Sequence, residues 1–110
     1  MTPRRSTSAA PLSYNGTLVL QAIVQGHGYG FDIMRATHLP SGTVYPLLRR
    51  LEATKQVESR WEEADEAHDE GRPPRRYYGA TPEGRAALAE ARERVLAQQA
   101  LFGAPDPAGS

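Results

Sequence analysis

The apolar residues of this chain recur at intervals that predict four helices and two strands. A first helix is expected over 14–25, directly before Gly26, which is a common helix stop. A second, shorter helix is expected over 28–37, buried mainly through Ile33 and Met34. The first helix is predicted from its apolar residues, which fall at helical spacing and are Leu18, Val19, Ala22 and Ile23.

The third predicted helix has the clearest pattern. The pair Leu39-Pro40 ends the helix before it, because the residue before a proline avoids the α conformation. Ser41 is a suitable N-cap for a helix over 42–54. Pro46 lies near the first turn, where it costs at most one backbone hydrogen bond. One narrow stripe is expected to face the core and consists of Val44, Leu47, Leu48 and Leu51.

A hairpin and a last helix follow. Strands are expected over 57–63 and 75–80, joined by a polar loop over 64–74. The aromatic residues expected in the hairpin core are Trp61, Tyr77 and Tyr78. The last helix, expected over 81–101, begins with a threonine N-cap, a proline and an acid. The fold class is therefore mainly α with a small β-hairpin.

Composition fits one small domain. The chain has 110 residues, of which 39% are hydrophobic and 24% charged. No apolar run reaches the length of a membrane span, so neither a membrane partner nor a signal peptide is expected. The absence of cysteine excludes disulfides and thiolate metal sites, which fits a cytoplasmic protein.

Charge is unevenly distributed although the formal net charge is zero. Residues 1–60 hold seven basic residues and three acids, whereas residues 61–110 hold six and ten. Such asymmetry indicates an anionic partner for the first half, although a solvated surface produces similar counts.

Three helices followed by a hairpin is the element order of the winged helix-turn-helix, whose third helix enters the DNA major groove. Such a helix needs one apolar face for docking and one small or polar face for DNA. Here Arg49 and Arg50 can reach phosphate or guanine, and the helix start can bind phosphate. The alternative is an ordinary solvated surface helix. The residues expected to contact DNA are Ser41, Gly42, Thr43, Tyr45, Pro46, Arg49 and Arg50.

Several linked segments together resemble the PadR family of transcriptional regulators. The run from Gly42 to Leu51 matches the family pattern Gly-Thr-apolar-Tyr-Pro-x-Leu-x-x-Leu. Upstream, the segment 27–33 resembles the family's opening of the second helix. Downstream, 71–78 resembles the wing and 81–84 the start of the last helix. The link over 36–40 is several residues shorter than in many members.

The resemblance implies a repressor that binds double-stranded DNA as a homodimer through its last helix. The residues expected at the dimer interface are Leu18, Leu88, Ala91, Val95 and Phe102. The alternative is that the last helix packs on the first helix of its own chain, and both contacts together are favoured.

Some relatives bind small-molecule effectors near this interface. A stacking pocket on the last helix is not expected, because the single tryptophan is on the hairpin.

The tip of the hairpin carries charges of both signs. A dense group of acids over 62–70 would repel phosphate, so we expect it to point away from DNA. Arg72, Arg75 and Arg76 are expected to contact the DNA backbone, and the alternative is that they pair with these acids. Asp65, His68 and Asp69 could bind a metal only weakly on this loop, so no metal site is predicted there.

These observations predict four segments. They are a flexible arm over 1–11, a winged helix-turn-helix domain over 12–80, a dimerisation helix over 81–102 and a disordered tail over 103–110. No catalytic residue, metal or cofactor is expected, because no nucleophile has a plausible base beside it.

The alternative to a DNA-binding repressor is a protein–protein adaptor of the same fold. Salt-dependent duplex binding would separate the two.

Overall fold

The computed structural model describes residues 11–108, so nearly all of the expected arm lies outside the described residues. The chain is mainly helical with one antiparallel two-stranded sheet, as the sequence predicts. Within the described range, no helix combines the length and the apolar character needed to cross a bilayer. The elements are α1 Tyr14–Val24, α2 Gly30–Thr37, α3 Ser41–Ala53, β1 Val57–Trp61, α4 Ala64–Asp69, β2 Arg76–Ala80 and α5 Pro82–Gly103.

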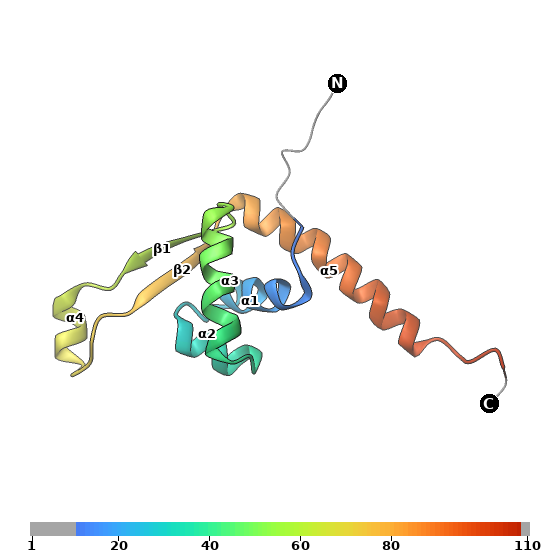
Figure 1. Cartoon of the computed structure of the whole chain (residues 1–110), viewed down its shortest axis with the longest axis horizontal. Helices are drawn as coiled ribbons and strands as arrows, with labels where there is room; N and C mark the ends of the chain where they lie inside the picture. Colours follow the sequence, from blue (N-terminus) through green and yellow to red (C-terminus); the bar gives the residue numbers. More distant parts are fainter. Residues whose placement is uncertain (1–10, 109–110) are drawn as a thin grey trace, which may run out of the picture.

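The molecule is elongated. Helices α1, α2 and α3 form a small body, from which the hairpin and α5 project on opposite sides (Figure 1). The radius of gyration is 17.3 Å, whereas a compact domain of this length would have about 13 Å. Both projecting parts therefore leave much of their surface uncovered by the rest of the chain.

The core lies where α1 meets the other helices. Val19 and Leu20 of α1 are fully buried, with Ile33 of α2 beside them in the same cluster. Each such side chain stabilises the fold by about 1.5–3 kcal/mol. The predicted stripe of α3 is confirmed, since Val44, Leu48 and Leu51 are buried and Leu47 packs against the cluster. The first turns of α5 complete the core with Ala87, Leu88 and Ala91.

Two helices, α2 and α3, begin at residues other than those predicted. Pro40, not Ser41, is the N-cap of α3, because proline holds the extended conformation there and Ser41 is already helical. Helix α2 begins at Gly30 rather than at residue 28. Gly28 instead accepts a hydrogen bond from the Tyr78 N–H at 2.7 Å, so this segment runs extended beside β2.

The hairpin connection differs from the predicted loop. Residues 64–69 form the short helix α4, which is anchored by Ala67, 1% exposed. Gly71 ends it in the left-handed conformation with φ 71°, and the Arg72 N–H donates to the Ala67 carbonyl at 3.1 Å. The strands are shorter than expected, because pairing runs only from Val57↔Ala80 to Trp61↔Arg76.

The start of α5 is fixed to the link between α3 and β1. Thr81 caps α5 as predicted, since its hydroxyl oxygen accepts the Gly84 N–H at 3.0 Å. The same hydroxyl donates to the Lys55 carbonyl at 2.6 Å, and the Thr81 N–H donates to the Gln56 carbonyl at 3.1 Å. A Cβ on Gly84 would overlap the Gln56 carbonyl oxygen and lie 2.9 Å from its carbon. The joint therefore requires glycine at position 84.

Candidate nucleic-acid interface

The outer face of α3 is open to solvent. Its buried face holds Val44, Leu48 and Leu51 against the core, so the opposite side points away from the body. Of the α3 residues predicted to contact DNA, only Thr43 is half-buried. The others are exposed and comprise Ser41, Gly42, Tyr45, Pro46, Arg49 and Arg50. The structure thus places a small, polar and basic strip along one docked helix.

The first turn of α3 can attract an anion. No side chain caps this helix, and Pro40 accepts the N–H groups of Thr43 and Val44 at 3.0 Å each. The N–H groups of Ser41 and Gly42, at the first two helical positions, have no intrahelical partner. Together with the helix dipole, they favour phosphate at this end.

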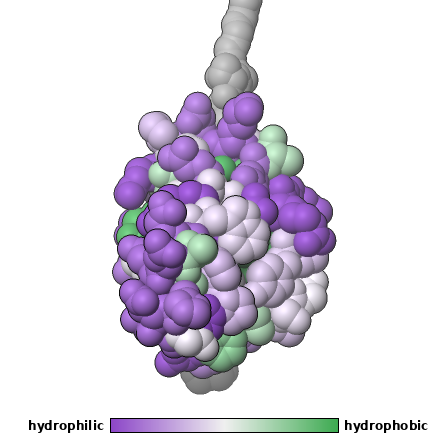
Figure 2. Space-filling view, turned by 90° about the vertical axis from the view of Figure 1, so that its left-hand side faces the viewer, coloured by the Kyte–Doolittle hydropathy of each residue, from purple (hydrophilic) through white to green (hydrophobic). Residues whose placement is uncertain are grey.

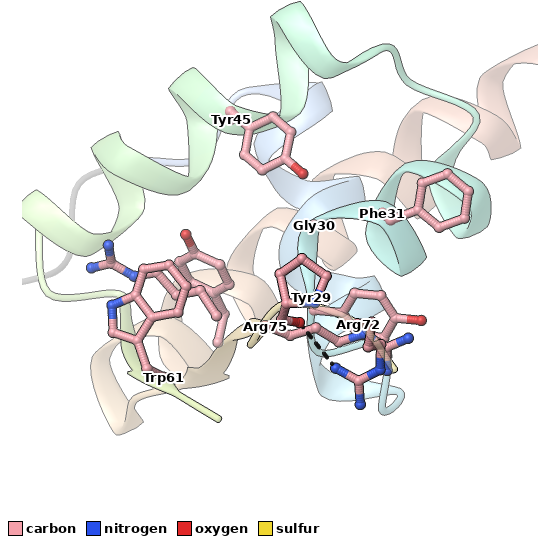
Figure 3. A pocket seen from close by; sticks show the side chains of 10 residues that line it. Tyr29, Gly30, Phe31, Tyr45, Trp61, Arg72 and Arg75 are labelled. Carbon is pink, nitrogen blue, oxygen red and sulfur yellow. Dashed lines mark hydrogen bonds between the residues drawn. The ribbon is translucent and has the colours of Figure 1, made fainter. Parts of the chain in front are cut away.

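Tyr45 lies directly against the start of α2. A Cβ on Gly30 would be 2.6 Å from the Tyr45 Cε1 atom, so only glycine allows this approach. Figure 3 shows the Tyr45 ring reaching from α3 toward Gly30. Its side chain remains 41% exposed. The sequence pattern predicts Tyr45 at the interface, but it does not predict the contact of Tyr45 with α2.

Arg76 connects the hairpin to α3. Its Nε atom donates to Ser59 Oγ at 3.0 Å, and its Nη2 atom donates to Glu52 Oε1 at 3.2 Å. Ser59 Oγ in turn donates to Glu52 Oε2 at 2.6 Å. Arg76 was predicted to contact DNA, yet in this network its Nε and Nη2 atoms donate to residues of α3 and β1. The network sets the position of the hairpin relative to α3.

Arg72 forms a paired contact with Glu62. Its two terminal nitrogens donate to the two carboxylate oxygens, with Nη2–Oε2 at 2.8 Å. The Arg75 N–H adds a bond to Glu62 Oε1 at 3.2 Å. The hydrogen bond from Arg72 lowers the pKa of Glu62 to about 2 and raises the pKa of Arg72. For Arg72, the structure therefore supports the alternative of internal pairing.

The Glu62 contact predicts a pH effect on stability. A carboxyl whose folded pKa is about 2 stabilises the fold fully above its ordinary pKa of 4.5, and the effect is lost as pH falls toward 2. We expect Glu62→Gln to flatten the fall in unfolding free energy between pH 4.5 and 2. Arg72→Gln should flatten the same interval, because it removes the partner. Urea unfolding across this range checks both, and unchanged profiles would contradict the assignment.

Arg75 differs from its two neighbours. Its guanidinium carbon lies 4.1 Å from the centre of the Tyr29 ring, a cation–π contact. Within residues 11–108, no carboxylate forms an ion pair with it. Among these three arginines, Arg75 is therefore the one whose guanidinium forms no ion pair within the described residues, although its charge helps to lower the pKa of Glu62.

Three aromatic residues near these arginines were missed or misplaced. Tyr29 and Phe31 lie in the segment 27–33 that carries the family resemblance, but neither of them was predicted to have a role in the site. Trp61 was expected in the hairpin core, but it is 62% exposed. The hairpin projects away from the helical body before β1 ends. The side chain of Trp61, the last residue of β1, is therefore exposed to solvent. Tyr78, on β2, does pack against the core cluster, and burial raises its pKa.

The end of the hairpin is hydrophilic and acidic. Figure 2 looks at the molecule from the side on which the hairpin projects in Figure 1 and shows a largely hydrophilic surface. Among residues 11–108, no cluster of three or more His, Cys, Asp or Glu is arranged to hold a metal. The exposed acids around α4 are Glu63, Asp65, Glu66, Asp69 and Glu70.

The residues predicted at the dimer interface divide into two groups. Leu88 and Ala91 are buried against α1 of their own chain. Leu18 and Val95 are half-buried and line a groove between α1 and α5. Phe102 is 89% exposed, together with Leu96 and Leu101. The helix thus packs on its own chain at its start and is uncovered toward its end.

Comparison with known proteins places these features in a family. The family model described as "Transcriptional regulator PadR-like family" matches residues 19–90. The transcriptional regulator Rv3488 of Mycobacterium tuberculosis is 38% identical over 104 residues, covering 93% of this chain and 83% of the relative.

Solved structures show the same fold. BpsR of Bordetella bronchiseptica, whose structure concerns the regulation of its DNA binding by 6-hydroxynicotinic acid, is 26% identical with a TM-score of 0.66. The match covers 88% of this chain and 70% of BpsR. A PadR family regulator from Clostridium difficile, 21% identical, gives a TM-score of 0.71 over 83% of this chain and 96% of that structure.

Proposed function

Because the chain belongs to the PadR-like family of transcriptional regulators, we propose that it binds double-stranded operator DNA as a homodimer and represses transcription. The observation that carries this proposal is the two-sided α3, docked through Val44, Leu48 and Leu51 and open on its opposite face. An open, basic helix held rigidly on a small body is what major-groove reading requires. The contact between Gly30 and Tyr45 supports a fixed orientation of this face.

The contacts divide by chemistry. Arg49 and Arg50 suit guanine edges or phosphates, and the Tyr45 hydroxyl suits a phosphate. The first turn of α3, with Ser41, Gly42 and Thr43, faces another phosphate through its N–H groups. On the wing, Arg75 is the phosphate contact, whereas Arg72 and Arg76 hold the wing in place.

The dimer is assigned to α5. Its uncovered distal half, with Leu96, Leu101 and Phe102, needs a partner surface of the same kind. A two-fold dimer would also carry two α3 helices onto successive major grooves, about 34 Å apart. Residues 12–80 then form the DNA-binding unit and 81–102 the dimerisation unit of a cytoplasmic regulator. The DNA binding of BpsR is regulated by a small molecule. We propose that a small-molecule effector also controls DNA binding by this chain.

Selection from a random duplex library tests this function. The full chain should enrich one palindromic sequence, and footprinting should show two protected half-sites one helical turn apart. Recovery of no preferred duplex would favour the adaptor alternative.

Arg49→Ala tests the role of α3. The exposed side chain can be removed without loss of core packing, so the variant should fold normally. We expect affinity for the selected duplex to fall by about 1–3 kcal/mol. Arg85→Ala, with the same charge change on an exposed position of α5, should bind like the native chain. Titration with a labelled duplex checks both, and equal affinities for all three proteins would remove Arg49 from the interface.

A further inference from the structure

An open groove runs between α3 and the wing. It has a volume of about 470 Å³ and is walled by the start of α2, by Tyr45 of α3, and by both limbs of the hairpin connection. In Figure 3, the rings of Tyr29, Phe31, Tyr45 and Trp61 surround this space. The groove therefore lies between the two elements that are proposed to contact DNA.

A DNA strand that binds both elements has to cross this groove. In a winged helix-turn-helix, the third helix enters the major groove and the wing lies at the flanking backbone or minor groove. The major and minor grooves of a duplex are separated by one sugar–phosphate strand. A chain that reads the major groove with α3 and touches DNA with its wing therefore has that strand between the two. This placement of the strand rests on the proposed function.

The polar groups of the groove suit phosphate. Its lining residues that the structure describes include donors of the arginine, tyrosine and tryptophan types and no carboxylate. Arg72 is paired with Glu62, and Arg76 is paired with Glu52, which both lie outside the lining. Arg75 forms no ion pair within the described part of the chain, although its charge also acts on Glu62. The groove is therefore only weakly positive, and a bound strand needs contacts to its sugars as well.

Two exposed rings in the groove can supply contacts to sugars. Phe31 of α2 is 60% exposed, and Trp61 of β1 is 62% exposed. The phenylalanine ring offers no hydrogen bond, so burial against the apolar face of a deoxyribose is what it gains from DNA. The indole of Trp61 offers a ring face and one N–H donor, which a phosphate oxygen can accept.

Arg76 holds Trp61 at a set position relative to α3. Its guanidinium carbon lies 5.7 Å from the centre of the Trp61 ring. The same guanidinium donates to Glu52 of α3 and to Ser59 of β1. A contact that is already in place loses little conformational freedom when the partner binds. Trp61 is therefore suited to position a duplex relative to the helix that is proposed to read it.

We propose that this groove receives the DNA strand between the major groove read by α3 and the minor groove beside the wing, and that Trp61 is a backbone contact. The indole ring packs on a deoxyribose and its Nε1–H donates to a phosphate oxygen. Phe31 packs on a neighbouring sugar of the same strand. Such contacts position the duplex but carry no base information. Trp61 thus adds affinity for every sequence, whereas α3 selects among sequences.

Fluorescence of the full chain tests the contact, because Trp61 is its single tryptophan. In the free chain, acrylamide should quench the emission strongly, since the side chain is 62% exposed. Saturation with the duplex selected by the native chain should lower the quenching constant several-fold. Unchanged quenching in the complex would overturn the proposal while leaving the DNA function intact.

Substitutions separate a backbone contact from a base contact. Trp61→Ala should lower the affinity for the selected duplex and for a scrambled duplex by the same factor, about tenfold, and Phe31→Ala should act alike. Arg49→Ala should instead lower the ratio of the two affinities. Tyr14→Ala removes an exposed ring outside the groove and should bind as the native chain does. Thermal melts confirm folding of each variant. No loss of affinity in a folded Trp61→Ala, or a loss confined to the selected duplex, would overturn the proposal.

A scan with methylphosphonates locates the phosphate. Each test duplex carries one neutral linkage in place of a phosphate, at successive positions along one strand. At one position between the major groove of the half-site and the adjacent minor groove, the neutral linkage should weaken binding by the native chain about tenfold. Trp61→Phe keeps a ring but lacks the indole N–H, so it should be nearly insensitive at that position.

The scan also separates the failure of this contact from the failure of the proposed function. A folded Trp61→Phe that responds to every neutral linkage as the native chain does would overturn the hydrogen bond from Trp61 while leaving DNA binding in place. A full chain that binds no duplex would overturn the proposed function and the groove assignment with it.

Discussion

Gly84→Ala is expected to lower the free energy of unfolding by about 3 kcal/mol, the upper end of the range for overpacking. The added Cβ would overlap the Gln56 carbonyl oxygen, which is backbone and cannot rotate away. Relief requires α5 to move off the link between α3 and β1, which breaks the Thr81 bonds to Lys55 and Gln56. In a thermal melt, we expect the midpoint to fall by more than about 10 °C.

Gly103→Ala is the matched control. Gly103 is the last residue of α5, and nothing lies within 4 Å of the Cβ that alanine would add. Alanine also has the higher helix propensity, so stability should stay the same or rise by a few tenths of a kcal/mol, up to about 1. A Gly84→Ala chain as stable as Gly103→Ala would show that α5 does not dock on this joint as described.

The double variant Leu101→Asp with Phe102→Asp is expected to yield a folded monomer that no longer binds its operator tightly. The two side chains are 74% and 89% exposed within one chain, so their loss costs the monomer little. In the proposed dimer each would be buried, and a buried large apolar side chain contributes about 1.5–3 kcal/mol. Two changes per chain therefore remove several kcal/mol of association, and an unpaired acid in the interface adds a further cost.

Sedimentation at micromolar concentration measures this result. Ala86→Asp adds an acid at an exposed position near the start of the same helix and should sediment like the native chain. If the double variant still sediments as a dimer, the distal half of α5 is not the interface. If the native chain is itself a 12.0 kDa species that binds a palindrome tightly, the dimer proposal is wrong.

The order of the helices and strands could be predicted because each main helix carries a clear apolar stripe or cap. Val44, Leu48 and Leu51 on α3 and the Thr81 cap of α5 are local signals, and local signals suffice for them. Helix α4 was missed because its only buried residue is Ala67, which gives no apolar period. The start of α2 was placed too early, because its pairing with β2 involves residues about 50 positions apart.

The candidate interface was predictable on α3 and much less so on the wing. Arg72, Arg75 and Arg76 look alike in the sequence, yet they contact Glu62, Tyr29 and Glu52 respectively. These partners lie in other elements, and their choice depends on the register of the hairpin. The same limit applies to α5, where Leu88 and Phe102 share one helical period although the first packs within its chain and the second is exposed.

The measurement that tests the central claim most directly is the salt dependence of duplex binding by the full chain, with stoichiometry from sedimentation of the complex. We expect two chains per selected duplex and a logarithmic fall of affinity with salt, because phosphate contacts release counterions. Arg75→Gln should reduce the slope by about two, one phosphate contact from each chain. Binding that does not depend on salt, or one chain per duplex at saturation, would contradict a dimer that reads DNA through α3 and the wing.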